Sequence, residues 1–435
     1  MNIEELYSVF TGSSGVTTDT RAIAGNEIFF ALKGENFNGN TFVREALDRG
    51  CKFVVADDPS LASLEGVEVV KDVLEVLQEL AIFHRRRWKG RVLAITGSNG
   101  KTTTKELVAS VLSRRYKILF SEGNLNNHIG VPLTLLKIRD EEIAIIEMGA
   151  NHQGEIARLS EIVAPDVGII TNIGKAHLEG FGGLEGVKRG KGELYDYLAL
   201  CDRLAIVNMS DPILASMVKE RGLKYFSYGT TNDCTVQGRL QESEIEIDGS
   251  FTIEGVKYMM QSGLFGSYNF MNMLTAAATG IYYGVLPSEI SRAIASYIPE
   301  NNRSQVIKGK SNTLIMDAYN ANPTSMSLAL DEFERCGHEK KMVILGDMHE
   351  LGEDESPEHE AVLRKLVASG LRDVLLVGER FSRFSATPDF PFRFFSGLGK
   401  CMEYLHENKP EKSLILLKGS RKNALEKLTN LLLNN

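Results

Sequence analysis

The chain has 435 residues, of which 43% are hydrophobic and 24% charged, with a formal net charge of −8 and a pI near 5.7. This composition is ordinary for a globular protein, and the length favours about two to four domains over a single core. The acidic balance argues against a general nucleic-acid-binding protein.

The first ten residues, MNIEELYSVF, are acidic and have no signal-peptide pattern, and no uninterrupted apolar run approaches membrane-spanning length. We therefore expect a cytoplasmic protein without membrane insertion. The five cysteines, at positions 51, 201, 234, 336 and 401, are scattered without paired spacing. Such cysteines are typical of reduced, buried thiols and indicate no zinc site.

The first predicted region, residues 1–86, is a small α/β unit. Short strand patterns, among them Glu27–Leu32 and Lys52–Ala56, alternate there with helical patterns. The basic segment His84–Gly90 follows. We expect this segment to be a solvated connector, because a run of like charges usually lies on a solvated face.

A strand, a glycine-rich loop and a helix follow in the stretch AITGSNGKTTTKEL, Ala94–Leu107. Arg91–Thr96 is rich in strand formers, and helical spacing of apolar residues begins after Lys101. The unpaired N–H groups and the dipole of a helix N-terminus favour a bound anion. Lys101 can reach terminal phosphates, and the Thr102 hydroxyl can bind Mg²⁺. The stretch therefore predicts a nucleoside triphosphate site.

The glycine spacing of this loop is shorter than usual. The general pattern G-x-x-x-x-G-K-[ST] has four residues between its glycines, whereas only Ser98 and Asn99 separate Gly97 from Gly100. A glycine turn with a solvated lysine is the alternative. The agreement of strand, loop, lysine, threonine and helix in order favours the phosphate site.

Residues 87–302 repeat a strand-then-helix pattern, with apolar runs at Ile143–Ile146, Val167–Ile170 and Leu204–Val207. This pattern favours a mostly parallel sheet with ligands at the carboxyl ends of its strands. Glu147 ends the first of these runs. A carboxylate in that position near a P-loop commonly holds the Mg²⁺ of the nucleotide, and a capping or turn role is the alternative.

Two further residues of this region are candidates for binding. His177 lies in the loop TNIGKAHLEGFGG after the strand Val167–Ile170, where a binding residue would be placed, although a loop histidine can also be merely exposed. Lys191 stands close to Lys188 and Arg189, a pattern that by itself is typical of a solvated helix face.

Two amide-rich segments are suited to polar ligands. NLNNHIGVPLTLL, Asn124–Leu136, places amides before a glycine turn. In LIMDAYNANPTSM, Leu314–Met326, Asp317 could bind ribose hydroxyls, and Asn320 or Asn322 could bind an adenine edge. An Asx-turn that leads into a helix is the alternative for these asparagines.

The polar segment Tyr297–Arg303 marks a second boundary. Residues 303–435 then alternate helical stretches with apolar runs, which predicts a smaller α/β domain. The apolar runs are Thr313–Met316, Met342–Leu345, Val374–Val377 and Leu414–Leu417.

The ordered motifs of the chain resemble those of the Mur ligases, the ATP-dependent enzymes that form amide bonds in peptidoglycan precursor synthesis. The motifs are TGSNGKTTTKEL, NLNNHIGVPLTLL, EMGANHQGEI, TNIGKAHLEGFG, KGEL, GSYNFMNMLTAAA, DAYNANPTSM and ILGDMHELG. The last two are most similar to members of the family that join D-alanyl-D-alanine to UDP-N-acetylmuramoyl-tripeptide. The resemblance covers nearly the whole chain.

The resemblance implies three domains: a UDP-sugar-binding domain (residues 1–86), a central ATPase (87–302) and a C-terminal Rossmann-like domain (303–435). It also implies ATP, two Mg²⁺ ions, a UDP-MurNAc-tripeptide and D-Ala-D-Ala as ligands, with an acyl phosphate as the intermediate. We expect a monomer whose domains close about the linkers near residues 86–90 and 298–303, because the ligands come from different domains.

By resemblance, each candidate residue has a role. Lys101, His177, Lys191 and Arg303 are expected to be catalytic, with Lys191 carried as a carbamate. The expected metal ligands are Thr102, Glu147, His177 and the Lys191 carbamate. The expected ATP-binding residues are Gly97, Ser98, Asn99, Gly100, Lys101, Thr102, Thr103, Asn269, Asn272, Asp317 and Asn320.

The segment Thr18–Asn40 is similar to the uridine-nucleotide-binding segment of the family, which implies that Thr20, Arg21 and Asn38 bind the UDP-sugar. The chain departs from the family pattern at four positions: Thr20 replaces a serine, Asn38 and Asn40 replace an aspartate and a histidine, and Tyr268 replaces a histidine.

Two other functions remain open. One is a different ligase of the same superfamily, such as the enzyme that adds the third peptide residue or a folylpolyglutamate synthase. The motif DAYNANP argues against it. The other is a nucleotide-binding regulatory protein without ligase activity, against which the set of Lys101, Thr102, Glu147, His177 and Lys191 argues.

Overall fold

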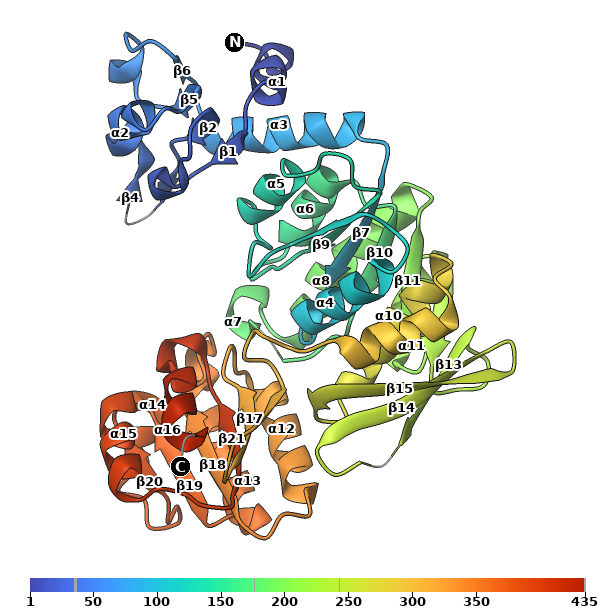
Figure 1. Cartoon of the computed structure of the whole chain (residues 1–435), viewed down its shortest axis with the longest axis vertical. Helices are drawn as coiled ribbons and strands as arrows, with labels where there is room; N and C mark the ends of the chain where they lie inside the picture. The colour runs from blue at the N-terminus through green and yellow to red at the C-terminus, as the bar shows by residue number, and fades with distance from the viewer. Residues whose placement is uncertain (35–36, 176, 242, 434–435) are drawn as a thin grey trace.

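The computed structural model describes residues 1–34, 37–175, 177–241 and 243–433. Figure 1 shows three successive α/β units, the first at the top, the second in the middle and the third at the bottom. This three-unit α/β architecture is the one that the sequence predicts. In the described part of the chain, no helix combines the length and the apolar character needed to cross a membrane.

The N-terminal unit has a small sheet in which all neighbouring strands are parallel. Its spatial order is β1 (Gly15–Thr17), β2 (Glu27–Phe30), β5 (Phe53–Ala56) and β6 (Val67–Val69). β2 and β5 are the two strands predicted in this region. Helices α1 (Ile3–Thr11) and α2 (Val43–Asp48) cover the sheet, and the apolar side chains of β2 and β5 are buried between them.

Helix α3 (Val73–Arg87) links the N-terminal unit to the central unit and packs against α5 (Gly130–Leu135) and α6 (Glu155–Val163) (Figure 1). The prediction of a solvated connector is wrong for His84 and Arg85, which are both buried. The Arg85 guanidinium is 2.9 Å from Asp166 and donates to two carbonyl oxygens at the end of α6. Burial of this charge is tolerated because its donors are paired.

The central sheet is parallel around the P-loop strand, as predicted. β7 (Arg91–Thr96) lies between β9 (Ile143–Glu147) and β10 (Val167–Ile170). The sheet continues outward on both sides through β8 (Ile118–Phe120), β11 (Leu204–Asn208) and β12 (Lys224–Gly229). The inner strands are buried along almost their whole length because helices cover both faces, which explains their continuous apolar runs.

An antiparallel extension, which the sequence did not predict, joins the central sheet to the C-terminal sheet. It consists of β13 (Val236–Gln241), β14 (Glu246–Ile253) and β15 (Val256–Phe265). Leu264 of β15 then pairs with Gln305 of β16 (Gln305–Lys308), so that within the described residues one sheet of 15 strands runs through both units.

The C-terminal unit is a parallel sheet with helices on both faces, in agreement with the predicted Rossmann-like domain. The order of its strands is β17 (Thr313–Asp317), β21 (Leu414–Lys418), β18 (Lys341–Gly346), β19 (Asp373–Val377) and β20 (Arg393–Phe395). Four of these strands contain the predicted apolar runs. Helices α12 (Pro323–Arg335) and α13 (Glu355–Ser369) pack against one another beside the sheet.

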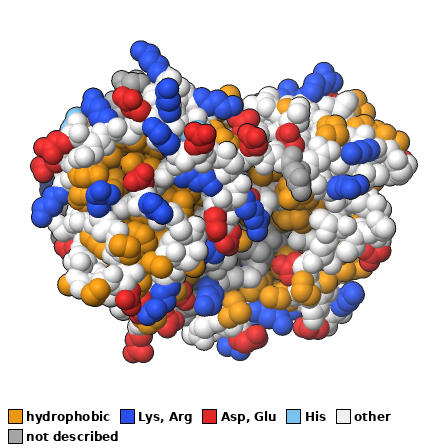
Figure 2. All heavy atoms as spheres, turned by 90° about the horizontal axis from the view of Figure 1, so that it is seen from below, with side chains coloured by type: hydrophobic (Ala, Val, Ile, Leu, Met, Phe, Trp, Pro, Cys, Tyr) orange, Lys and Arg blue, Asp and Glu red, His pale blue; other side chains and the backbone are white. Residues whose placement is uncertain are grey.

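The surface of the molecule in the view of Figure 2 carries acidic and basic side chains side by side. They do not gather there into a broad basic patch of the kind that would track a nucleic-acid backbone.

Candidate active site between the central and C-terminal units

A cavity of about 940 Å³ lies where the carboxyl ends of the central strands face the C-terminal unit. Its walls come from the P-loop, the segments after β9 and β10, the start of α10 (Asn269–Tyr282), and the ends of β17 and β21. The described wall residues run from Ser98 to Lys418, so the N-terminal unit contributes none of them.

The P-loop has the backbone that its glycines predict. Gly97 and Gly100 have φ values of 142° and 78°. A Cβ atom at Gly97 would lie 2.0 Å from Thr171 Oγ1, and one at Gly100 would lie 2.6 Å from Asn272 Oδ1. Both positions therefore need glycine for conformation and for space. Helix α4 (Lys101–Leu112) begins directly after the loop, and within the described residues no side chain caps its first turn. Its N–H groups are available to an anion.

Lys101 lies across its own loop. Its Nζ donates to Gly97 O at 2.7 Å and to Ser98 O at 3.2 Å. Burial lowers the pKa of Lys101, and the neighbouring Glu147 carboxylate opposes that shift. The amine is thus held at the centre of the loop, where a bound phosphate would meet it.

Glu147 has the geometry of a metal ligand. Its Oε1 accepts hydrogen bonds from Thr102 Oγ1 at 3.2 Å and from Asn126 Nδ2 at 2.8 Å. Its Oε2 is buried and has no hydrogen-bond partner among the described residues, with Lys105 Nζ at 3.8 Å. The Lys105 ammonium balances part of this charge, but Oε2 accepts no direct hydrogen bond among the described residues. Mg²⁺ between Thr102 and Glu147 fits this arrangement.

His177 contacts the C-terminal unit. Its Nδ1 lies 2.6 Å from Oε2 of Glu350, and both residues line the cavity. The hydrogen bond from His177 holds the pKa of Glu350 below its usual value, while burial opposes that shift. His177 therefore faces the same space as Glu147, on a loop that touches both units.

Lys191 is buried on α8 (Leu184–Leu200), so the solvated helix face that its neighbours suggested is wrong for this residue. Its Nζ donates to Ala150 O at 3.1 Å and lies 4.9 Å from the Phe181 ring. Burial, followed by the charge of Lys101, lowers the pKa of Lys191 far below its ordinary value. The residue lies directly behind the wall to which Ala150 belongs.

The predicted metal ligands do not form a preassembled cluster of acids and histidines. In the part of the chain that the structure describes, no group of three or more His, Cys, Asp or Glu side chains is placed to hold an ion. The predicted set has two such residues, Glu147 and His177, together with Thr102 and Lys191.

Asn269 and Asn272 lie in the first turn of α10 and line the cavity. Asn272 accepts from Thr104 Oγ1 at 3.0 Å and donates to Asn269 Oδ1 at 2.8 Å, and Asn269 donates to Phe265 O. These bonds fix α10 against the P-loop helix. Tyr268, the residue before them, lies 3.2 Å from the Ser304 hydroxyl and does not take part in these bonds.

Asp317 ends β17 at the cavity, but its carboxylate is already engaged. Oδ2 accepts from the buried Lys418 Nζ at 2.5 Å, and Oδ1 accepts from the Ser304 N–H at 3.2 Å. Asn320 lines the cavity and accepts from the N–H of Ala321. The contact with a ribose predicted for Asp317 would therefore share the carboxylate with Lys418.

Arg303 enters the cavity from the linker between the two units. Its guanidinium carbon lies 3.9 Å from the centre of the Tyr319 ring. Its Nε is buried without a hydrogen-bond partner among the described residues. The flanking residues Asn302 and Ser304 have φ values of 56° and 49°. The guanidinium stacks on Tyr319 and keeps donor capacity for an anion.

Asn322 connects the C-terminal unit to the P-loop. Its Oδ1 caps α12 by accepting from the Ser325 N–H at 2.8 Å, which confirms the turn-and-cap alternative for this residue. Its Nδ2 donates to Asn99 Oδ1 at 2.8 Å. One side chain therefore both begins a helix and contacts the loop that would hold phosphate.

The residues predicted to bind the UDP-sugar lie in the N-terminal unit, away from the cavity. Thr20 is buried, Arg21 pairs with Asp19, and Asn38 accepts from the backbone and the side chain of Asn40. Residues 35 and 36 of the similar segment lie outside the described residues.

Tyr319, Glu350 and Lys418 are among the wall residues that were not predicted. Lys418 directly follows the apolar run Leu414–Leu417, and a charged residue at the end of a buried parallel strand could have indicated it. Glu350 and Tyr319 lie inside motifs of the family resemblance, but nothing in their local pattern indicated a contact with the central unit.

Comparison with protein-family models gives three consecutive matches. The Mur ligase family catalytic domain matches residues 13–85, the Mur ligase middle domain matches residues 95–280, and the glutamate ligase domain of Mur ligases matches residues 302–421.

Individual proteins are similar over the full length. The UDP-N-acetylmuramoyl-tripeptide--D-alanyl-D-alanine ligase of Bacillus subtilis is 35% identical, over 95% of this chain and 92% of the relative. The crystal structure of MurF from Acinetobacter baumannii has a TM-score of 0.87 at 30% identity and covers 100% of this chain and 99% of its own. MurF from Thermotoga maritima in complex with ADP has a TM-score of 0.84 at 24% identity, with 98% of both chains covered, which shows the fold.

Proposed function

The chain belongs to the Mur ligase family, and we propose that it joins D-alanyl-D-alanine to UDP-N-acetylmuramoyl-tripeptide with conversion of ATP to ADP and phosphate. Relatives with this activity in their names align with nearly the whole chain. The observation that carries the proposal is the single cavity that brings the P-loop, Glu147, His177, Arg303 and the end of β17 together.

The reaction has two steps. The terminal carboxylate of the tripeptide attacks the γ-phosphate of ATP, and ADP leaves. The free amine of D-alanyl-D-alanine then attacks the carbonyl of the acyl phosphate, a C–N bond forms, and phosphate leaves with one oxygen of the former carboxylate. Because the first step joins two anions, positioning and charge neutralisation contribute most of the catalysis.

The residues of the cavity are suited to these needs. Lys101 and the free N–H groups of α4 hold phosphate oxygens, and Arg303 donates to the transferring group. Closure of the space between the two units would exclude water from the acyl phosphate, which would otherwise hydrolyse. Closure about the linkers near residues 86–90 and 298–303 commits the substrates to reaction.

Thr102 and Glu147 would hold one Mg²⁺, and His177 would contribute to a second site. Bound Mg²⁺ neutralises phosphate charge during transfer. The orphaned Oε2 of Glu147 is the feature of the chain that fits this cation.

Lys191 is suited to carbamylation. Its buried environment favours the neutral amine, which is the form that reacts with CO₂, with loss of a proton, to give a carbamate. The resulting anion would balance cations nearby, whereas an ammonium group would repel them. Lys191→Ala should lose activity, and small carboxylic acids should restore part of it. Full activity of this variant would contradict the carbamate.

The N-terminal unit would hold the uridine nucleotide through Thr20, Arg21 and Asn38. In this proposal residues 1–86 bind the UDP-sugar, residues 87–302 bind ATP, and residues 303–435 bind the dipeptide. Because the substrates are nucleotides of the cell interior, the reaction belongs in the cytoplasm.

Product analysis with ATP, UDP-MurNAc-tripeptide and D-Ala-D-Ala tests the proposal. We expect equal amounts of UDP-MurNAc-pentapeptide, ADP and phosphate, and the release of ADP should depend on the dipeptide. Release of ADP and phosphate that is independent of the dipeptide would contradict a ligase. Replacement of the dipeptide by single amino acids, glutamate among them, separates this activity from that of other ligases of the superfamily.

A further inference from the structure

Two segments from different units meet beside the cavity. The segment of the central unit that carries Lys175, His177 and α7 (Leu178–Phe181) meets residues 350–358 of the C-terminal unit, where α7 contacts the short helix η4 (Gly352–Asp354). Among the described residues, His177 Nδ1 lies 2.6 Å from Oε2 of Glu350, and Lys175 forms an ion pair with Glu358 at 3.2 Å. Only the first pair involves residues that line the cavity.

The backbone at this contact is strained on both sides. His177 has a φ of 52° and Glu350 has a φ of 62°. A residue other than glycine in this region is unfavourable by about 1–3 kcal/mol and persists where the surrounding structure fixes it, often at functional sites. Strain at both ends of one hydrogen bond indicates that the two side chains are held toward each other.

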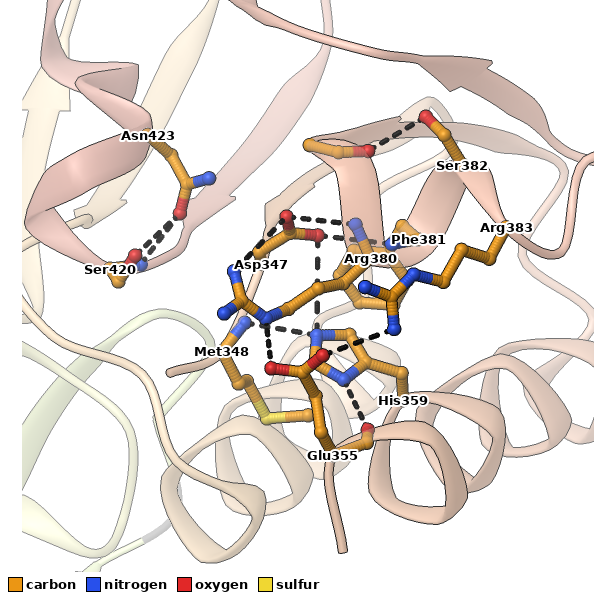
Figure 3. A network of polar contacts seen from close by, with 11 residues as sticks. Asp347, Met348, Glu355, His359, Arg380, Phe381, Ser382, Arg383, Ser420 and Asn423 are labelled. Atoms are coloured by element: carbon orange, nitrogen blue, oxygen red, sulfur yellow. Dashed lines mark hydrogen bonds and ion pairs between the residues drawn. The ribbon is translucent and has the colours of Figure 1, made fainter. Parts of the chain in front are cut away.

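The loop that carries Glu350 is fixed to the C-terminal unit at both ends. Figure 3 shows Asp347 accepting the N–H groups of Arg380 and Phe381, and His359 accepting the N–H of Met348. His359 has no exposed surface. The position of Glu350 therefore follows that of the C-terminal unit as a rigid body.

The other end of the loop is fixed by ion pairs. Glu355, which follows η4, pairs with Arg380 and Arg383 (Figure 3). Its backbone oxygen also accepts from Nδ1 of His359 at 2.6 Å. A movement of the C-terminal unit would carry the whole loop and separate Glu350 from His177.

The hydrogen bond determines which nitrogen of His177 is available to a ligand. A carboxylate only accepts, so the proton lies on Nδ1 of His177. Nε2 has no hydrogen-bond partner among the described residues, and His177 lines the cavity. A metal-binding histidine almost always donates its second ring N–H in this way, commonly to a carboxylate, which fixes the ring and its tautomer.

We propose that Glu350 is a positioning residue for His177: it holds the imidazole in the Nδ1–H tautomer, leaves Nε2 for a divalent cation, and makes that site depend on contact between the two units. The proposal rests on the proposed function, which supplies the second cation. The metal site is then complete only when the C-terminal unit is docked, so phosphate transfer is coupled to closure.

The first test needs no metal and no substrate. In the ¹⁵N–¹H spectrum of histidine-labelled protein, His177, assigned by comparison with His177→Gln, should show the Nδ1–H tautomer. Glu350→Ala should shift His177 toward the Nε2–H form that free histidine prefers. Glu350→Gln can still accept from Nδ1 through its amide oxygen, so it should retain most of the wild-type signal.

The second test measures cation binding directly. Mn²⁺ replaces Mg²⁺ and is titrated by electron paramagnetic resonance in the presence of a non-hydrolysable ATP analogue. We expect two bound ions in the wild type, and in Glu350→Ala we expect a dissociation constant for the weaker ion raised by about 10- to 100-fold. Glu358→Ala is the matched control, because it removes the neighbouring ion pair without touching His177. It should bind both ions as the wild type does.

An unchanged tautomer of His177 in Glu350→Ala would overturn the proposal. So would a single Mn²⁺ ion in the wild type, or equal loss of affinity in Glu350→Ala and Glu358→Ala. Circular dichroism checks that each variant folds. If Glu350→Ala does not fold, Glu350→Gln is used for the Mn²⁺ titration, and its affinity for the weaker ion should lie between those of the wild type and His177→Gln. Formation of pentapeptide by the wild type is scored separately, so failure of this proposal leaves the ligase assignment standing, and the reverse also holds.

Discussion

The two sides of the cavity are built differently. On the P-loop side, Lys101 bonds to carbonyl oxygens three and four residues away in its own loop. Thr102 bonds to Glu147 at the end of β9, the strand beside β7. On the C-terminal side, Asp317 bonds to Lys418, which is 101 residues away. Asn322 and Glu350 reach the cavity by bonding across to the other unit.

This difference separates what is preformed from what depends on assembly. The central unit alone contains the bonds of Lys101, Thr102 and Glu147, so the P-loop side should hold nucleotide whatever the position of the C-terminal unit. The C-terminal side contributes Arg303, Tyr319 and Asn322 only when the units are docked. Four variants or conditions test this division.

The largest effect is expected from Lys418→Met. Removal of the lysine leaves Asp317 as an uncompensated charge in a buried site, which should lower the free energy of unfolding by about 3–5 kcal/mol. Urea denaturation measures this. Asp317→Asn combined with Lys418→Met should recover part of the loss, because no lone charge remains. A loss below about 1 kcal/mol in the single variant would show that the C-terminal side does not depend on this pair.

Lys101→Met should act on catalysis rather than on folding. We expect kcat to fall by about 10²- to 10³-fold, because a cation directed at the transferring phosphate is lost. The free energy of unfolding should change by about 1 kcal/mol or less, since the hydrogen bonds of Lys101 within the described residues go to carbonyl oxygens of its own loop. A kcat within tenfold of the wild type would contradict the role of Lys101.

Acidification should destabilise the protein through two buried histidines. Burial lowers the pKa of both His359, which accepts from the Met348 N–H, and His84 on α3. The unfolded chain therefore binds more protons than the folded protein below the ordinary histidine pKa. The contribution of these two histidines to the free energy of unfolding is present in full above the ordinary histidine pKa of about 6.5. It is lost as the pH falls below that value, by about 1–2 kcal/mol between pH 7 and pH 5.

Urea denaturation at each pH measures this slope, and His359→Gln should reduce it. The reduction should be accompanied by loosening of the loop that carries Glu350, on the C-terminal side only. An unchanged slope in His359→Gln would show that this histidine is not held neutral.

The smallest effect is expected from Asn322→Asp. Aspartate preserves the cap of α12 but cannot donate to Asn99 Oδ1, so one hydrogen bond between the units is lost. The KM for ATP should rise by an amount equivalent to about 1 kcal/mol, with little change in unfolding. Asn322→Ala removes the cap as well and should also lower stability. Equal KM values in the wild type and Asn322→Asp would remove this contact from the account.

Much of the fold was predictable because it depends on local sequence patterns. The strands β7, β9 and β10 are continuous apolar runs that helices cover on both faces, and the P-loop glycines fill positions that need positive φ. The antiparallel strands β13–β15 were missed, because half-exposed strands in a meander give a weaker pattern. The burial of His84 and Arg85 was missed because a run of charged residues does not indicate which distant carbonyl oxygens will accept its hydrogen bonds.

The candidate site divides in the same way. Lys101, Thr102 and Glu147 follow from strand ends and loop composition. Lys191 could be singled out only by resemblance, because its burial depends on packing of α8 beneath Ala150. The contact of Glu350 with His177 could not be predicted from the local pattern, since it arises where the two units meet.

Transfer of oxygen from the tripeptide to phosphate tests the central claim most directly. With ¹⁸O at both oxygens of the terminal carboxylate of the tripeptide, attack on the γ-phosphate and later release of phosphate should move one ¹⁸O atom into each phosphate released. Mass spectrometry of that phosphate gives the answer. One ¹⁸O per phosphate is the expected result, and phosphate without ¹⁸O, formed at the same rate as the pentapeptide, would contradict the account.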